Sequence, residues 1–171
     1  MKNLNPTFVR IASLLAAISL LTCSALAQTE AQKAFAAIKN MPGTCEKKNA
    51  DGQTLQVTFK TVSGGSAVVS EIQGKGPEDM VSMIHLDGPD RILMTHYCSI
   101  GNQPRMVGTV SKDGKTITFN YLDATNLATP DAGHMQKMVL TLVAGDHHTE
   151  EWVFVDHGKE MKEVFDLRRK M

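Results

Sequence analysis

Short runs of alternating apolar and polar residues dominate the chain after residue 43. Residues 54–60 read T-L-Q-V-T-F-K and residues 116–122 read T-I-T-F-N-Y-L, so nearly every second side chain is apolar. A period of two is typical of a strand with one buried face. Turn-forming residues such as Asp51-Gly52 separate the runs. The expected strands span 45–49, 54–60, 67–72, 80–86, 91–98, 106–111, 116–122, 135–143, 148–155 and 161–168.

A single helix is expected ahead of these strands, over residues 29–39. Phe35 and Ile38 recur at helical spacing and form an apolar stripe. Thr29 with Gln32 three residues later is the pattern of a capping box. One short helix cannot cover the faces of a parallel sheet, which disfavours an α/β fold.

About ten short strands joined by tight turns indicate an antiparallel meander. Closing such a sheet on itself removes its exposed edges and makes an up-and-down barrel. The sequence therefore predicts an all-β, antiparallel up-and-down barrel of about ten strands with one short N-terminal helix.

The central hairpin holds the densest group of chemically capable side chains. Its strands, 80–86 and 91–98, flank the turn sequence Asp87-Gly88-Pro89-Asp90. If Gly88 and Pro89 form the tip, Asp87 faces Asp90. One face of the hairpin would then carry Val81, Met83, His85, Ile92, Met94, His96 and Cys98. This register predicts a pocket lined by Met83, Met94 and His96.

Two polar turns follow strands of the same direction, so both are expected at one mouth of the barrel. Asn102 and Arg105 lie in the first, and Asp123 and Asn126 lie in the second. His134 begins the next strand. These five residues are predicted to form a polar mouth above the pocket, where barrels commonly bind ligands. The alternative is structural: Arg105 pairs with Asp123, and Asn126 ties loop backbone.

The remaining polar residues predict little chemistry. His147, His148 and His157 lie in or beside hairpin turns and are expected on the surface. Trp152 and Phe154 are expected in the core. Glu150 and Glu151 should point to opposite faces of a strand, so they cannot act together on one bond. His96 and Cys98 lack a third ligand, and no nucleotide, hydrolase or zinc-protease motif occurs, so no metal or cofactor is expected.

The N-terminus has the pattern of a secretory signal peptide. Lys2 and Arg10 precede an apolar run over 11–21, and Ala25 and Ala27 form a small-residue cleavage pattern. Cleavage after Ala27 predicts a periplasmic or secreted protein. The alternative is a lipoprotein anchored through Cys23. The run over 11–21 is too short to span a bilayer, which needs about 20 residues, and no other membrane span is expected.

Removing 27 of the 171 residues leaves 144, over 28–171, enough for one domain. Loss of Lys2 and Arg10 from 18 basic residues leaves 16 against 18 acidic ones. This near balance disfavours a nucleic-acid-binding protein, which usually has a basic face. Cys45 and Cys98 remain after cleavage. In an exported chain they are either joined in a disulfide or are two buried thiols.

Several motifs resemble those of uncharacterised exported bacterial proteins. They are His85-Leu86-Asp87-Gly88, Thr95-His96-Tyr97-Cys98, Gly101-Asn102-Gln103-Pro104-Arg105-Met106, Asp123-Ala124-Thr125-Asn126-Leu127 and Gly133-His134-Met135. A helix followed by a ten-strand meander also resembles the calycins, which include lipocalins, fatty-acid-binding proteins and nitrobindin-like haem barrels. Cys45 stands where that group has a Trp after Gly43. The resemblance implies a lipocalin-like barrel without an assigned activity.

Together these features predict an exported protein that binds a small hydrophobic or amphipathic molecule. The ligand site would comprise Met83, Met94, His96, Asn102, Arg105, Asp123, Asn126 and His134. One alternative is a hydrolase- or isomerase-type enzyme in which His96 or His134 is the general base. Another is a haem-binding barrel that uses one of these histidines as axial ligand.

Overall fold

The computed structural model describes residues 27–41, 43–49, 52–74 and 79–170. The predicted leader, including Cys23, lies outside these ranges except for Ala27.

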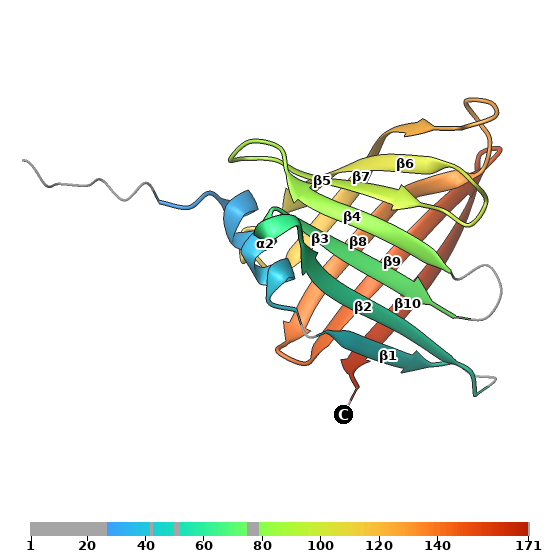
Figure 1. The fold of residues 1–171 in the computed structure, drawn as a ribbon. Coiled ribbons are helices and arrows are strands. Elements are labelled where there is room, and N and C mark those ends of the chain that lie inside the picture. Colours follow the sequence, from blue (N-terminus) through green and yellow to red (C-terminus); the bar gives the residue numbers. More distant parts are fainter. Residues whose placement is uncertain (1–26, 42, 50–51, 75–78, 171) are drawn as a thin grey trace, which may run out of the picture.

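Ten antiparallel strands form a closed lipocalin-like barrel in which each strand pairs with its neighbours in the chain and β10 pairs with β1 (Figure 1). The predicted all-β fold is therefore confirmed. The strands are β1 (Thr44–Lys48), β2 (Thr54–Val62), β3 (Ala67–Gln73), β4 (Met80–Leu86), β5 (Ile92–Tyr97), β6 (Gln103–Val110), β7 (Thr116–Thr125), β8 (His134–Ala144), β9 (His147–Asp156) and β10 (Lys159–Arg169).

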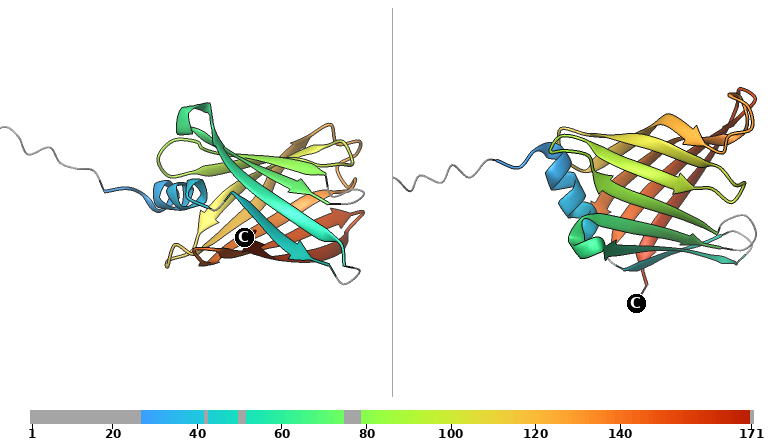
Figure 2. Two further views of the ribbon diagram at one scale, coloured as in Figure 1. Left: turned by 60° about the horizontal axis from the view of Figure 1, so that its bottom comes forward. Right: turned by 45° about the horizontal axis from the view of Figure 1, so that its top comes forward.

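Helix α2 (Glu30–Lys39) covers one end of the barrel, which we call the helix end (Figures 1 and 2). Its capping box forms as predicted, because Thr29 and Gln32 bond to each other's backbone N–H. Phe35 and Ile38 are buried in the core, with 4% and 0% of their surface exposed. The Thr29 hydroxyl also donates to the carbonyl of Pro89 in the β4–β5 turn. The opposite end, with the turns at 98–102, 126–133 and 156–158, is called the open end.

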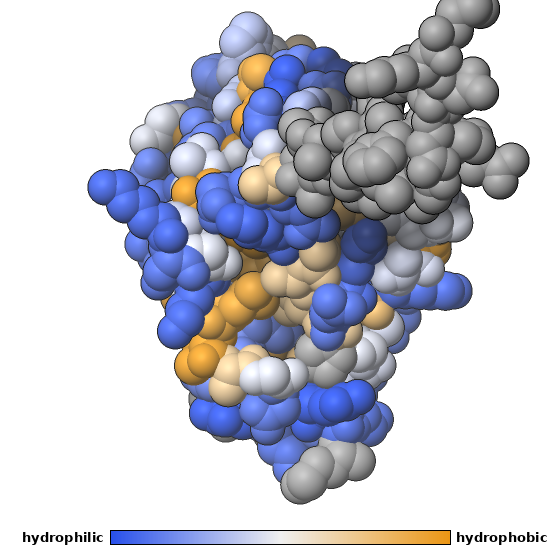
Figure 3. Space-filling view, turned by 90° about the vertical axis from the view of Figure 1, so that its left-hand side faces the viewer, coloured by the Kyte–Doolittle hydropathy of each residue, from blue (hydrophilic) through white to orange (hydrophobic). Residues whose placement is uncertain are grey.

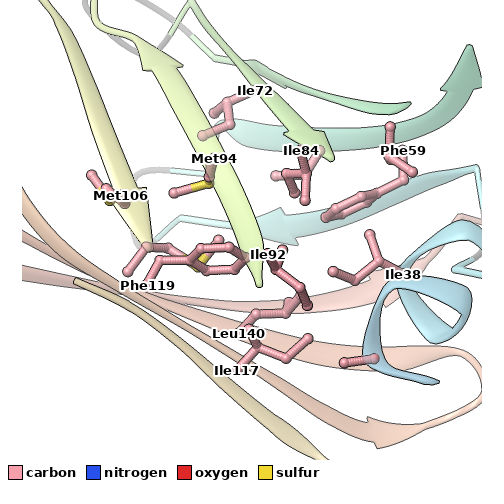
Figure 4. Packing of buried hydrophobic residues seen from close by; sticks show 14 of the residues in the cluster. Ile38, Phe59, Ile72, Ile84, Ile92, Met94, Met106, Ile117, Phe119 and Leu140 are labelled. Carbon is pink, nitrogen blue, oxygen red and sulfur yellow. The ribbon is translucent and has the colours of Figure 1, made fainter. Parts of the chain in front are cut away.

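The middle of the barrel is filled with apolar side chains. Met94 reaches the interior from β5, and Phe119 and Leu140 reach it from the neighbouring strands β7 and β8; each is fully buried (Figure 4). Burying a side chain of this size stabilises the fold by about 1.5–3 kcal/mol. The two pockets described below therefore lie towards the ends of the barrel.

The central hairpin has a different register from the predicted one. Ser82 pairs with His96, and Ile84 pairs with Met94, one residue away from the expected partners. The loop has three residues, not two, because the N–H of Asp87 donates to the carbonyl of Arg91 at 2.9 Å. Gly88 adopts a φ of 72° in this loop, a conformation that glycine adopts without strain.

This one-residue difference moves every side chain of β4 to the other face. Ser82 and Ile84 point into the barrel and are buried, whereas Met83 and His85 lie on the outer face. The prediction that Met83 lines the pocket with Met94 and His96 is therefore wrong for Met83.

The two cysteines lie in parts of the barrel that are not neighbours. Cys45 lies in β1 and Cys98 follows β5, and both are buried without a disulfide between them. Burial raises the pKa of the Cys45 thiol. The structure thus agrees with the buried-thiol alternative. Among the described residues, no helix is long and apolar enough to cross a membrane.

Candidate functional site

The two polar turns meet at the open end. The side-chain amide of Asn126 donates to the carbonyl of Gly101 at 2.6 Å. The amide of Asn102 donates to the carbonyl of Gly133 at 2.7 Å. The expectation that both turns lie at one end of the barrel is confirmed. Both asparagines hold loop backbone in place, which is the structural alternative considered for Asn126.

Arg105 and Asp123 pair directly across β6 and β7. The Arg105 Nε donates to Asp123 Oδ1 at 2.6 Å, and a second bond joins Nη2 to Oδ2. These hydrogen bonds lower the pKa of Asp123 and raise that of Arg105. Both side chains are about half exposed, at 46% and 51%, and project from the outer wall. This pair does not line a pocket, because its residues occupy the outward-facing positions of β6 and β7.

His134 is nearly buried, with 6% exposure. Its Nδ1 lies 2.7 Å from the carbonyl of Ala132, and its Nε2 lies 3.1 Å from the side-chain amide of Gln136. Its ring also packs against Tyr121, with the centroids 4.5 Å apart. Because both ring nitrogens have partners, His134 fixes the end of the 126–133 segment and is not poised to accept a proton from a substrate.

An apolar pocket of about 180 Å³ lies at the open end, and we call it the mouth pocket. Met135 of β8 and Met161 of β10 flank Phe154 of β9 as its direct cross-strand neighbours. Ile72 and Met80, which pair with each other on β3 and β4, complete the lining from neighbouring strands. The lining residues are Ile72, Met80, Met135, Trp152, Phe154, Met161, Lys162, Glu163 and Phe165.

A charged pair formed by Lys47 and Glu163 lies at this pocket. Lys47 Nζ is 3.7 Å from Glu163 Oε1 and 4.8 Å from the centre of the Phe165 ring. Lys47 also donates to the carbonyl of Val164 at 3.0 Å. The mouth pocket therefore combines aromatic and thioether surface with charged groups at its edge: Lys162 and Glu163 in its lining, and Lys47 beside Glu163.

A chain of buried polar side chains begins behind the mouth pocket. His96 is fully buried, packs 4.7 Å from Trp152, and has its Nδ1 2.9 Å from the Ser82 hydroxyl. Burial lowers the pKa of His96 to about 4, so its imidazole is neutral at pH 7. Trp152 Nε1 donates to Glu150 Oε2 at 2.9 Å. Glu150 Oε1 lies 3.5 Å from Nε2 of His148.

His148 opens onto a second pocket, which we call the helix-end pocket. Its volume is about 350 Å³, and it lies between the C-terminal end of α2 and the β8–β9 hairpin. Figure 3 views this end of the molecule, where hydrophobic surface is exposed between hydrophilic regions. The lining residues are Ala37, Asn40, Met41, Lys115, Leu142, Val143, Ala144, Gly145, His147 and His148.

The predicted site residues are thus only partly assembled. Met94 and His96 point inward but lie in the packed middle, whereas Asn102, Asn126 and His134 hold loops. The residues that do line pockets include His148, expected on the surface, and Trp152, expected to be core only. The alternation of His148, Glu150, Trp152 and Phe154 along one strand was the signal for a shared inward face.

The comparisons with known proteins add no family to this geometry. No protein-family model and no curated protein matches the sequence.

Proposed function

We propose that this protein binds a small hydrophobic or amphipathic molecule in the mouth pocket. The observation that carries the proposal is the convergence of Trp152, Phe154, Phe165 and methionines from three strands on one open pocket of the barrel. Aromatic rings supply large apolar contact area. Apolar pockets with a few polar groups at their edge are the usual form of small-molecule sites.

The pocket's volume constrains the size of the ligand. At about 180 Å³ it is smaller than the roughly 300–1,000 Å³ of most ligand pockets. Met80 and Met135 are only partly buried, and Met161 is 48% exposed. Methionine is unbranched and adapts to irregular shapes. We therefore propose a slender ligand that enters end-on, with its polar group near Lys47 and Glu163.

The single tryptophan of the chain makes this proposal directly measurable. Trp152 is the only Trp and lines the mouth pocket. N-phenyl-1-naphthylamine, an uncharged aromatic dye, should bind there, quench Trp152 emission and gain emission of its own. A saturable titration with both signals supports the proposal, and the absence of Trp152 quenching at saturating dye would contradict it.

Two residues of β10 provide a matched pair of variants. Met161 and Val164 are both 48% exposed, but Met161 lines the pocket and Val164 lies on the outer face, opposite Glu151. Met161→Glu places a charge beside the bound dye and should weaken binding by at least about tenfold. Val164→Glu adds the same charge on the outside and should leave the affinity unchanged. Equal effects of the two substitutions would argue against a mouth site.

The geometry gives less support to the alternatives of general-base catalysis and haem ligation. His96 has no exposed surface and packs on Trp152. Both ring nitrogens of His134 have partners. Neither imidazole is positioned to meet a substrate or a haem iron, so we propose binding and not catalysis.

We also propose that the protein acts outside the cytoplasm, on the basis of its N-terminal sequence. Intact mass spectrometry of the protein purified from whole native cells, membranes included, should give a chain beginning at Gln28. A chain beginning at a lipid-modified Cys23 would support membrane anchoring instead. A chain that retains residues 1–27 would contradict export.

A further inference from the structure

The helix-end pocket is chemically different from the mouth pocket. It has an apolar wall made by α2 and the β8–β9 hairpin, and its lining includes one lysine and two histidines but no acidic residue. Its volume of about 350 Å³ lies within the range of small-molecule sites. It is separated from the mouth pocket by the packed middle of the barrel.

His148 is a buried polar group with unmet hydrogen-bonding capacity. It is 2% exposed, and neither ring nitrogen has a hydrogen-bond partner within the described part of the chain. Nε2 is 3.5 Å from Glu150 Oε1, so Nε2 faces a hydrogen-bond acceptor. Nδ1 faces no hydrogen-bond partner in the described part of the chain. A buried polar group without a partner costs about 1–3 kcal/mol, and a ligand group that reached Nδ1 would recover part of this cost.

Lys115 supplies a cation at the same pocket. Its carbonyl accepts from the N–H of Leu142 at 2.8 Å, and Leu142 pairs with His148 across β8 and β9. Two strand spacings therefore separate Lys115 from His148, roughly 10 Å between Cα atoms. Among the described residues, no carboxylate lies within ion-pairing distance of the Lys115 amine. An extended lysine and an imidazole can both contact one head group across this gap.

Three nearby carboxylates are already engaged, and a fourth, Asp146 of the β8–β9 turn, is not among the residues that line the pocket. Asp166 lies 2.8 Å from His147 Nε2, and Glu150 accepts from Trp152 and faces His148. Asp113, on the same turn as Lys115, accepts from the Ser111 hydroxyl and the Lys115 backbone N–H. The unpaired charge that lines the helix-end pocket is therefore positive, which complements an anion.

We propose that the helix-end pocket binds a small aliphatic carboxylate. The aliphatic chain lies against Met41 and Leu142, and the carboxylate lies between Lys115 and His148. A carboxyl group satisfies Nδ1 in either protonation state of His148: the acid donates to the neutral ring, and the carboxylate accepts from the protonated ring. This site is independent of the mouth pocket and does not rest on the function proposed for that pocket.

Methionine methyl groups distinguish the two sites in one experiment. Met41 lines the helix-end pocket, whereas Met80, Met135 and Met161 line the mouth pocket. Sodium octanoate, titrated into protein labelled with ¹³C at the methionine methyl groups, should shift the Met41 signal. If octanoate shifts only the three mouth methyls, or none, the second site is wrong. The first of these results would leave the mouth proposal intact.

Two lysines of one turn provide the control for charge. Lys115 lines the pocket and Lys112 does not, and both are exposed, so neither substitution threatens the core. Lys115→Gln should weaken octanoate binding about fivefold and leave 1-octanol binding unchanged, because only the carboxylate loses an ionic partner. Lys112→Gln should change neither. Equal weakening by both substitutions would overturn the assignment of Lys115.

The role of His148 is tested by a neutral substitution. His148→Gln should weaken octanoate and 1-octanol alike, because both head groups bond to the imidazole. Unchanged positions of the mouth methyl signals in this variant would show that the barrel is still folded. Unchanged affinity for both probes in a folded variant would remove His148 from the site.

Discussion

Lowering the pH from 7.5 to 5 should destabilise this barrel through His96. Burial lowers the pKa of His96 from 6.5 to about 4 in the folded chain, while the unfolded chain keeps the ordinary value. Between these values the unfolded state binds more protons, so the free energy of unfolding falls as the pH falls. For one group with these two pKa values, the loss between pH 7.5 and pH 5 is about 2 kcal/mol.

The measurement compares urea unfolding at the two pH values in wild type and two variants. His96→Gln removes the buried titrating group, and His85→Gln makes the same change on the outer face of the same hairpin. Wild type and His85→Gln should lose about 2 kcal/mol more than His96→Gln, a midpoint difference of about 1 M urea. The titrating groups that all three proteins share contribute equally to each of them. Parallel profiles for wild type and His96→Gln would show that His96 is not a buried neutral group.

Three further predictions concern the barrel interior and its wall. Gly108→Ala should destabilise by about 1–3 kcal/mol in chemical denaturation, because the added methyl carbon would lie 3.0 Å from the Phe119 ring. Phe119→Ala should cost about 3–5 kcal/mol in the same assay, since the ring is fully buried and leaves a cavity; a loss below 1 kcal/mol would contradict the packing in Figure 4. The thiols of Cys45 and Cys98 should react with a disulfide reagent only after unfolding, because both are buried, and rapid reaction of the folded protein would contradict their placement.

Much of the fold was predictable because the local signals agree with each other. The capping pattern at Thr29, the apolar stripe of α2 and the alternation within the strands all depend on neighbouring residues. The order of strands in the barrel also follows, because a meander with tight turns leaves each strand beside its neighbour in the chain. The hairpin register was not predictable in the same way. It depends on whether the loop after Leu86 has two or three residues, and Asp87-Gly88-Pro89-Asp90 fits both.

The candidate site was less predictable because it depends on contacts between distant strands. Arg105 and Asp123 were correctly expected to be near each other, but Arg105 alternates with the inward-facing Met106, so the pair lies on the outer wall. His148 follows a turn, which is normally a surface position, yet it points inward between Leu142 and Leu167. Whether an inward residue lines a pocket or fills the core depends on the side chains opposite it, and alternation within one strand does not contain that information.

The most direct test of the mouth-binding proposal is to determine where a bound apolar molecule lies in the protein. Intermolecular nuclear Overhauser effects should be measured between bound N-phenyl-1-naphthylamine and the labelled methionine methyl groups. Contacts are expected to Met80, Met135 and Met161 and to the indole of Trp152. Contacts to outward-facing Met83 without contacts to the three mouth methyls would contradict the mouth-binding proposal.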